Sequence, residues 1–336
     1  SRVLPYLKRA PRLLMFWLIV AVFAVALLRS FFPNEGFDEV RTGEVPLEVA
    51  AADDGVWVLN YGDHSVSLID PATAEEQFEV EVGDDVGVAL SANDDGAWVV
   101  LDGGATIGRI DADQQAVAET YDVAAVIDDG TKAQDLSAAD GVVWVTTGEG
   151  GQMVRVDTAS GEVGEPVDFG GPVVQPQILG DSVWVNLGGS LAEHDAATGE
   201  ELRVVETDHR IHDFVVSGDG LWTLSDVDNF EETGLVITVD PESGDEINRV
   251  RISDTRPSHI TYDEGLLFVT GSEGQLVELS TDPLAHEATE LVTVSTKNLK
   301  GVVVHEGVIW AADGTNGVVH QPLGGIEGEP PETTLL

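Results

Sequence analysis

One feature of this sequence constrains its fold more than any other: a motif that recurs seven times along the chain. Each copy holds acidic residues and a glycine, an apolar run with one large aromatic residue, a polar turn and a second apolar run, as in DDGVWVLNYGDHSVSLID. The aromatic residues lie 38 to 46 residues apart, at Trp57, Trp98, Trp144, Trp184, Trp222, Phe268 and Trp310. Repeats of about 40 residues with strand-like content are typical of propeller blades, each a four-stranded sheet. The sequence therefore predicts an all-β fold, a seven-bladed β-propeller over residues 37–325.

Each repeat divides into four expected strands. The innermost strand precedes the acidic residue and glycine, and the second carries the aromatic residue, which we expect to pack between neighbouring blades. The third strand ends at an aspartate whose carboxylate can accept hydrogen bonds from the turn that follows, at Asp70, Asp111, Asp157, Asp195 and Asp240. The turn between the first two strands calls for a positive φ, which we expect at Gly55, Gly96, Gly141, Gly220, Gly265 and Gly307. The fourth strand forms the outer edge.

The last repeat supplies only three strands before the sequence GGIEGEPPETTLL, whose residues 326–336 we expect to form a C-terminal tail. We predict that residues 37–45, FDEVRTGEV, provide the missing outer strand of the seventh blade. Such a closure joins the two ends of the ring and leaves no free sheet edge between them.

A hydrophobic segment lies ahead of the propeller. The sixteen residues between Arg12 and Arg29 carry no charge, and Phe31 and Phe32 extend the apolar stretch. A membrane-spanning helix needs roughly 20 apolar residues, with about 17 as the lower limit. We therefore predict a transmembrane signal anchor at residues 13–32, which places these residues in the lipid bilayer, and a short linker at 33–36.

The charges around this segment predict its orientation. Four basic residues precede it within residues 1–12, whereas acidic residues follow it, so the positive-inside rule keeps the N-terminal stub in the cytoplasm. A cleaved signal peptide is the alternative, because Ala24-Val25-Ala26 fits a cleavage site, although Leu27 and Leu28 continue the apolar run past it. Both interpretations place the propeller outside the cytoplasm, and the anchor predicts a single-pass protein of the cell membrane.

The chain is strongly acidic, with 61 Asp and Glu residues against 16 Lys and Arg residues and a formal net charge of −45. Such a surface repels polyanions, which excludes nucleic acid as a partner. The hydrophobic fraction of 43% argues against disorder. We interpret the carboxylates as adaptation to high salt, as in a halophilic organism, with an ordinary acidic extracellular domain as the alternative. The sequence has no cysteine, so it forms no disulfide.

The segment GVWVLNYGDHSVSLIDPATAEE resembles the YVTN-type repeat of surface and periplasmic propellers, which share the shape VWVaN-x-x-x-x-vsvID-x-x-tG. The resemblance covers residues 37–325; Asn60 of the first repeat has a counterpart only in Asn186, and the sixth repeat lacks the tryptophan. The repeats are also similar to those of streptogramin lyases, within a wider group of quinoprotein-like propellers. The lyase family places His and Glu residues and a divalent metal around its funnel, but this sequence offers no residue-by-residue match to that cluster. We therefore predict no catalytic residue, no metal and no cofactor.

The axial funnel is the usual ligand site of a propeller, so the segments that lead into the innermost strands supply the candidate binding residues. These segments hold three of the four lysines of the chain, together with histidines, arginines and two glutamines. The candidates are Lys132, Gln134, Gln175, His209, His212, Arg256, His259, Lys297 and Lys300. A cationic mouth of this kind would focus an anionic ligand or an acidic partner. The alternative is that these groups pair with nearby acids such as Asp135, Asp208 and Asp213.

Two further patterns suggest metal binding. His209 and His212 place two imidazoles close together, but no third ligand lies near them in the sequence. The acidic segment 225–234, SDVDNFEETG, departs from a calcium loop because Phe230 occupies a ligand position. We interpret it as a solvated loop.

Taken together, the short tether, the expected disc and the absence of a catalytic motif favour a binding function. We predict a scaffold or accessory protein that presents its loop face to a membrane or surface protein partner. The alternatives are a propeller enzyme, a lyase or hydrolase acting in the funnel, and a sensor that binds a small molecule there.

Overall fold

The structure is a computed structural model, and it describes residues 37–226, 233–253, 256–272, 274–281, 288–293, 298–315 and 317–323. The chain divides into two compact units, Ser1–Phe37 and Asp38–Leu336. The expected anchor at 13–32, with its flanking stub and linker, and the tail at 326–336 lie outside the described residues. Within the described residues, no helix combines the length and the apolar character that a membrane span requires.

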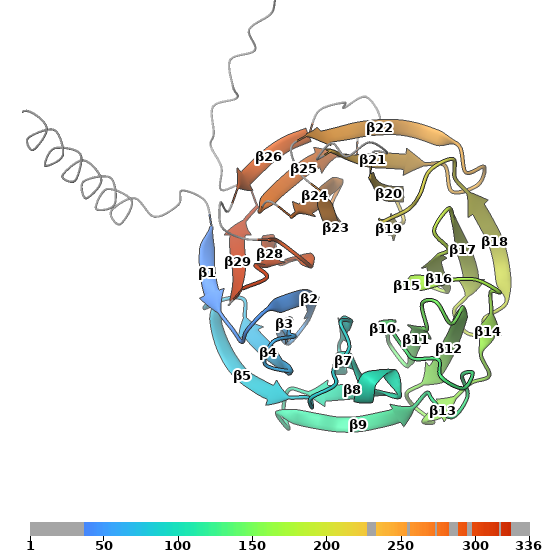
Figure 1. The fold of residues 1–336 in the computed structure, drawn as a ribbon. Coiled ribbons are helices and arrows are strands. Elements are labelled where there is room, and N and C mark those ends of the chain that lie inside the picture. Colours follow the sequence, from blue (N-terminus) through green and yellow to red (C-terminus); the bar gives the residue numbers. More distant parts are fainter. Residues whose placement is uncertain are drawn as a thin grey trace, which may run out of the picture. The chain divides into compact units, whose positions relative to one another are not determined.

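The second unit is an all-β, seven-bladed propeller whose sheets follow one another around a ring (Figure 1). Blades 1, 2 and 4 are regular four-stranded sheets with the strands in sequence order. Blade 1 comprises β2 (Pro46–Ala52), β3 (Gly55–Asn60), β4 (Ser65–Asp70) and β5 (Glu75–Glu81). Blade 2 comprises β6 (Leu90–Asn93), β7 (Gly96–Leu101), β8 (Thr106–Asp111) and β9 (Ala116–Asp122), with the 3₁₀ turn η1 (Asp102–Gly104) between its middle strands. Blade 4 comprises β15 (Val174–Leu179), β16 (Ser182–Asn186), β17 (Ser190–Asp195) and β18 (Glu201–Glu206).

Blades 5 and 6 repeat the same order, whereas blade 3 has a broken outer edge. Blade 5 comprises β19 (Asp213–Ser217), β20 (Gly220–Asp226), β21 (Thr233–Val239) and β22 (Glu246–Ser253). Blade 6 comprises β23 (Pro257–Asp263), β24 (Leu266–Gly271), β25 (Gln275–Ser280) and β26 (Ala288–Thr293). In blade 3, β10 (Asp135–Ala139), β11 (Val142–Thr146) and β12 (Gln152–Asp157) are followed by two short strands, β13 (Glu162–Val163) and β14 (Val167–Asp168), which both pair with β12.

Blade 7 combines the two ends of the propeller. β27 (Val302–His305), β28 (Val308–Ala312) and β29 (Gly317–Pro322) come from the C-terminal part, and β1 (Asp38–Arg41) pairs with β29 as the outer strand. The register places Asp38 opposite His320 and Arg41 opposite Gly317. This strand lies within residues 37–45, the range that the sequence indicates for it.

The seven marker aromatics all lie buried in the second strand of their blades. The six tryptophans among them pack in clusters that each join two neighbouring blades: Trp57 of blade 1, for example, belongs to the cluster that contains Ala97 and Val99 of blade 2. Burial of a large aromatic side chain removes on the order of 200 Å² from water. The interfaces between blades are therefore the hydrophobic core of the ring, as the repeat predicts.

Polar side chains on the innermost strands also connect one blade to the next. Gln177 in blade 4 accepts a hydrogen bond from the Val216 amide of blade 5 at 3.3 Å and donates one to the Phe214 carbonyl. Ser137 in blade 3 accepts a bond from the Ile178 amide of blade 4 at 3.2 Å. These bonds fix the spacing of the inner strands, which form the wall of the central channel.

The turns between the first and second strands use glycine largely as expected. Gly96 has φ +121°, and a Cβ there would lie 2.1 Å from the Ile110 carbonyl oxygen, so no other residue fits. Gly220 is the exception, because it does not adopt a positive φ. A Cβ at that position would lie 3.0 Å from the ring of Trp222, and the glycine therefore makes room for this aromatic side chain.

Candidate functional site

A cavity of about 370 Å³ lies at the end of the channel where the innermost strands begin. It is lined by residues from blades 1 to 6, which include Glu48, Leu90, Asp135, Gln177, Asp213 and His259. Because the first residues of the inner strands come together here, we call this end of the channel the mouth. A ligand in this cavity would contact almost the whole ring at once.

The mouth places an imidazole between two carboxylates. His259 Nε2 lies 3.4 Å from Glu48 Oε1, and His259 Nδ1 lies 3.6 Å from Asp213 Oδ2. The Asp213 side chain is 8% exposed, whereas the side chains of Glu48 and His259 are 25% and 32% exposed. Asp213 therefore forms the buried base of the group, and the other two side chains face the cavity.

Backbone and amide donors hold the Asp213 carboxylate in place. Oδ1 accepts hydrogen bonds from the Phe214 amide at 2.8 Å and from Gln175 Nε2 at 3.0 Å. Oδ2 accepts one from the Ile260 amide of the next blade at 3.0 Å. These three donors, from blades 4, 5 and 6, fix the position of the carboxylate.

Gln175 extends this network across the mouth. Its backbone amide donates to Asp135 Oδ2 at 3.0 Å, and its side-chain oxygen accepts from Asn186 Nδ2 at 2.8 Å. The residue has φ +54°, an uncommon conformation for a residue with a side chain. Asp135, Gln175, Asp213, His259 and Glu48 thus form one continuous polar chain.

Three inner strands are irregular at these residues. The register of β2 shifts between Pro46 and Glu48, and that of β23 shifts between Pro257 and His259. β15 shifts between Val174 and Gln177, around Gln175. Such bulges re-aim side chains and are frequent beside functional sites. Here they lie next to the residues that form the mouth.

The surroundings of these groups change their pKa values. Burial raises the pKa of Glu48 to about 7, although the charge of His259 opposes the change. Burial also raises the pKa of Asp135 to about 6, against the hydrogen bonds from the Leu136 and Gln175 amides. Burial alone would lower the pKa of His259, but the charge of Glu48 and the hydrogen bond and charge of Asp213 outweigh it and raise the pKa to about 9. At neutral pH the mouth therefore holds a cationic imidazole beside a carboxyl group that is close to its midpoint.

The structure brings some of the sequence-predicted site residues to this cavity. Gln134, Gln175 and His259 line it. Lys300 lies close enough for its charge to act on both Glu48 and His259. With Glu48, Asp135 and Asp213 in the wall, the described lining carries more carboxylates than cations, and it is less cationic than the sequence suggested.

Other candidates lie away from the cavity wall. Lys132 is exposed and lies beside the η1 turn. A Cβ added to Gly103 of this turn would be 3.3 Å from the Lys132 Nζ. Arg256 is also exposed, and its carbonyl accepts a hydrogen bond from the Ser272 amide. Lys297 and most of the acidic segment 225–234 lie outside the described residues.

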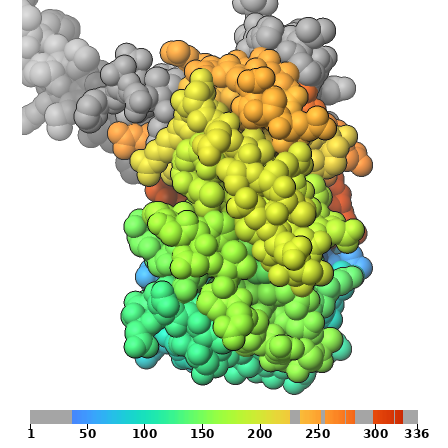
Figure 2. Space-filling view, turned by 90° about the vertical axis from the view of Figure 1, so that its right-hand side faces the viewer, coloured from blue at the N-terminus to red at the C-terminus, as the bar shows by residue number. Residues whose placement is uncertain are grey.

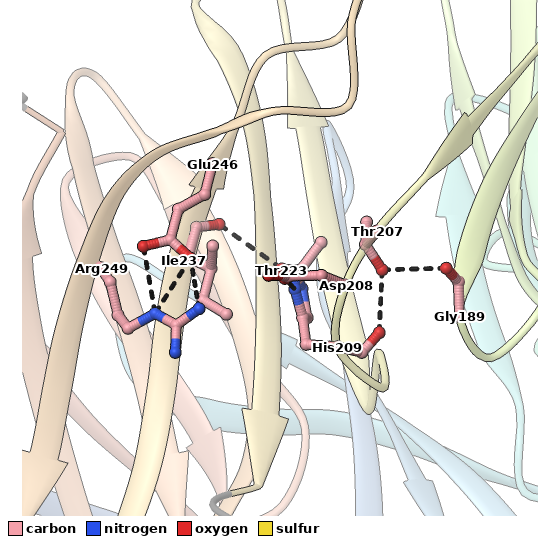
Figure 3. Close-up of polar contacts among 8 residues, drawn as sticks. All are labelled: Gly189, Thr207, Asp208, His209, Thr223, Ile237, Glu246 and Arg249. Atoms are coloured by element: carbon pink, nitrogen blue, oxygen red, sulfur yellow. Dashed lines mark hydrogen bonds and ion pairs between the residues drawn. The ribbon is translucent and has the colours of Figure 1, made fainter.

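The His209 ring is held by groups other than His212. Figure 3 shows His209 with its Nε2 2.8 Å from Thr223 Oγ1 and its Nδ1 3.2 Å from Asp208 Oδ1. The backbone amide of His212 donates a hydrogen bond to the Leu224 carbonyl, and its carbonyl accepts one from Gln175 Nε2 at 3.2 Å. Across the part of the chain that the structure describes, no group of three or more His, Asp or Glu side chains is arranged so that it could hold a metal ion.

Sequence reasoning did not select the three carboxylates of the mouth. Asp135 and Asp213 appeared only as possible ion-pair partners, although both begin an innermost strand, which is a signal that could have identified them. Glu48 lies inside the apolar run LEVAA and gives no such signal. Its position in the mouth depends on the bulge at the start of β2.

Comparison with known proteins supports the fold. Residues 69–210 match a family described as a repeat of unknown function, DUF6923. This match covers the end of blade 1 and all of blades 2 to 4. No curated protein matches the chain.

Solved structures share the ring architecture at low sequence identity. Virginiamycin B lyase from Staphylococcus aureus is 16% identical with a TM-score of 0.67, over 85% of this chain and 99% of that one. Hydrazine synthase from Kuenenia stuttgartiensis is 16% identical with a TM-score of 0.69, over 85% and 98%. BamB from Moraxella catarrhalis is 14% identical with a TM-score of 0.56, over 88% and 91%. Identities this low show the fold alone. The chain is therefore a seven-bladed β-propeller, and its residues 69–210 are similar to the DUF6923 repeat.

Proposed function

We propose that this protein is a membrane-anchored, extracytoplasmic binding propeller, an accessory or scaffold subunit that engages a membrane or surface protein at the mouth. In this proposal residues 13–32 hold the propeller at the outer surface of the cell membrane, with the N-terminus in the cytoplasm. The acidic surface keeps the protein soluble at high salt, where its charges are screened.

The observation that carries the proposal is the construction of the mouth. Three bulges at the starts of β2, β15 and β23 lie beside Glu48, Gln175 and His259. Such irregularities cost ladder hydrogen bonds, and a channel wall that served only to close the ring would not need them. A protruding segment of a partner would contact blades 1 to 6 in this cavity, which favours specific binding without a catalytic group.

A second candidate function rests on the pair Glu48 and His259. A carboxyl group with a pKa of about 7 beside a cationic imidazole is suited to proton transfer near neutral pH. This pair favours an enzyme, a lyase or hydrolase, or a small-molecule sensor that uses the same cavity. An anionic ligand would be held there by His259 and Lys300.

Affinity purification from detergent-solubilised native membranes at high salt, followed by mass spectrometry, tests the first proposal. The full chain should recover one or more membrane proteins in stoichiometric amount. Glu48→Gln and His259→Asn should lose this partner. Glu75→Gln, an exposed carboxylate at the other end of blade 1, is the matched control and should retain it.

Recovery of the propeller alone would overturn the scaffold proposal, as would equal recovery of the partner by all variants. Thermal shift measurements with anionic and cationic small molecules then address the second candidate. A ligand that stabilises the wild type but not Glu48→Gln or His259→Asn would support it.

A further inference from the structure

The end of the ring opposite the mouth carries a dense array of carboxylates. The turn between the first and second strands has at least one acidic residue in every blade, and none of these seven described turns contains lysine or arginine. The acidic residues are Asp53, Asp54, Asp94, Asp95, Asp140, Asp181, Asp219, Asp263, Glu264 and Glu306. We call this end of the ring the acidic face. Burial, and then the charge of the adjacent Glu264, raise the pKa of Asp263.

A groove of about 350 Å³ opens on the acidic face between blades 4 and 5 and reaches blade 6 at Thr281. Apolar groups dominate its wall, including Leu179, Trp184, Trp222, Pro241 and Ile247. Leu179 is 39% exposed and Ile247 is 52% exposed, although both are large aliphatic side chains. Figure 2 shows the side of the ring on which blades 3 to 5 lie, coloured from green through yellow to light orange.

The one cationic side chain in the described wall of this groove is already paired. Arg203 forms an ion pair with Glu193 and lies over the Trp184 ring, 5.2 Å from its centroid. Asp219, also in the wall, accepts a hydrogen bond from the Tyr262 hydroxyl. The groove therefore offers an apolar floor within a negatively charged rim.

We propose that this groove docks a basic segment of a partner protein, with an apolar side chain of the segment in the groove and its lysines or arginines over the surrounding carboxylates. Charge complementarity selects this occupant. A second copy of the chain would bring another acidic face against this one, and like charges at an interface oppose association. A neutral apolar segment would leave the crowded carboxylates without counter-charges.

The apolar floor and the acidic rim have separable roles. Salt reduces the attraction between exposed charges, since the Debye length falls from about 8 Å at 0.15 M to about 3 Å at 1 M. Apolar burial does not weaken in this way and is strengthened by many salts. The rim therefore increases the rate of encounter and the affinity at low salt, whereas the floor maintains binding at high salt.

A synthetic peptide, RKKLFKKR, labelled with fluorescein, serves as the probe, and RKKSSKKR is its matched control. Fluorescence anisotropy with the purified propeller should show binding of the first peptide at about 0.15 M and about 1 M salt. Ile247→Ser and Leu179→Ser should weaken this binding at both salt concentrations by about fivefold or more, because each removes apolar surface. Asp181→Asn should weaken it only at low salt.

Leu202→Ser is the control for the apolar substitutions. Leu202 is 55% exposed on β18 of blade 4 but does not line the groove, so this variant should bind the peptide as the wild type does. The proposal is overturned if the wild type does not bind RKKLFKKR, if RKKSSKKR binds equally well, or if Leu202→Ser weakens binding as much as Ile247→Ser.

The same experiment separates this site from the one at the mouth. Glu48→Gln should bind the peptide normally, because Glu48 lies at the other end of the channel. Loss of the membrane partner by Glu48→Gln with unchanged peptide binding would support both proposals independently. Retention of that partner would overturn only the proposal for the mouth.

Discussion

The carboxylates at the mouth and those in the turns after the third strands carry the same chemical group in opposite surroundings. Burial raises the pKa values of Glu48 and Asp135 to about 7 and about 6. The pKa values of Asp157, Asp195 and Asp240 are lowered instead, chiefly by hydrogen bonds from the turn that each one begins. Both sets belong to the same repeated blade, so the repeat alone does not determine the charge state.

The difference shows how one scaffold supports two uses of an acidic residue. A turn aspartate such as Asp195 accepts bonds from the Ala197 and Thr198 amides in full contact with water, and its charge stabilises local structure. A mouth carboxylate faces like charges and a wall that excludes much of the water, which makes its ionised form costly. A carboxyl group whose ionised form is costly is typical of a functional site. The mouth rather than the turns is therefore the candidate site.

The largest expected difference between the two sets concerns stability. Asp213→Ala should lower the free energy of unfolding by about 3 kcal/mol or more, because it leaves buried donors and His259 without their acceptor. Asp195→Ala should cost much less, since water can replace its bonds. Urea unfolding of both variants measures the comparison, and equal losses would contradict it.

The next effect is the dependence of stability on pH. Between pH 4.5 and about 7 the folded protein keeps a proton on Glu48 that the unfolded chain releases, so stability should fall as pH rises through this window. The contribution is on the order of 3 kcal/mol. His259 extends the fall, because its stabilising charge is present below pH 6.5 and is lost as pH rises through about 9.

Glu48→Gln should flatten this profile between pH 4.5 and 7. Chemical unfolding measured at intervals of pH tests the expectation. A wild-type profile that rises over this window would show that the mouth carboxyl groups are not destabilised by burial.

A smaller effect should be visible at the imidazole itself. NMR titration of His259 should show a cation that persists well above neutral pH. Glu48→Gln should lower this pKa, because it removes the charge that raises it most. Asp195→Asn, far from the mouth, should leave the titration unchanged, and an effect of equal size there would refute a local cause.

The smallest effect belongs to the turns. Asp240→Asn keeps an oxygen that can accept from the Glu242 and Ser243 amides, so stability near neutral pH should change little. The lowered pKa of Asp240 contributes stability that is present above pH 3.8 and lost on further acidification. The variant should therefore lose less stability than the wild type in acid, as followed by circular dichroism. An identical acid transition would argue against the role of this charge.

The fold could be predicted from the sequence because the residue that specifies each blade interface recurs in every repeat. A large aromatic residue must be buried at each interface between blades, so Trp57 and its counterparts recur at blade spacing and the blades can be counted. The turn aspartates could be predicted as well, because they also recur and because the hydrogen bonds they accept come from residues nearby in the sequence. Gly220 departs from the pattern, because its φ is not positive and a Cβ there would meet the ring of Trp222.

The mouth could be predicted only in part, because it depends on contacts between blades. The sequence places Gln175 and His259 at the starts of inner strands, but the direction of each side chain depends on a bulge in its strand. His209 occupies a similar place along the chain, yet its ring contacts Thr223. Glu48 is hidden among apolar residues, and its role follows only from the blades that lie opposite.

The pairing of β1 with β29 also determines when the ring can close during synthesis of the chain. β1 is the first strand of the propeller to be synthesised and its partner is the last. At roughly 5–20 residues per second, the interval between them is on the order of tens of seconds. Throughout that interval the growing chain is an open arc, and the apolar cluster that joins Val40 to Trp310 and Val318 has not yet formed. Only the completed chain can close the ring, so a ribosome that stops before Gly317 leaves the first strand without its neighbour.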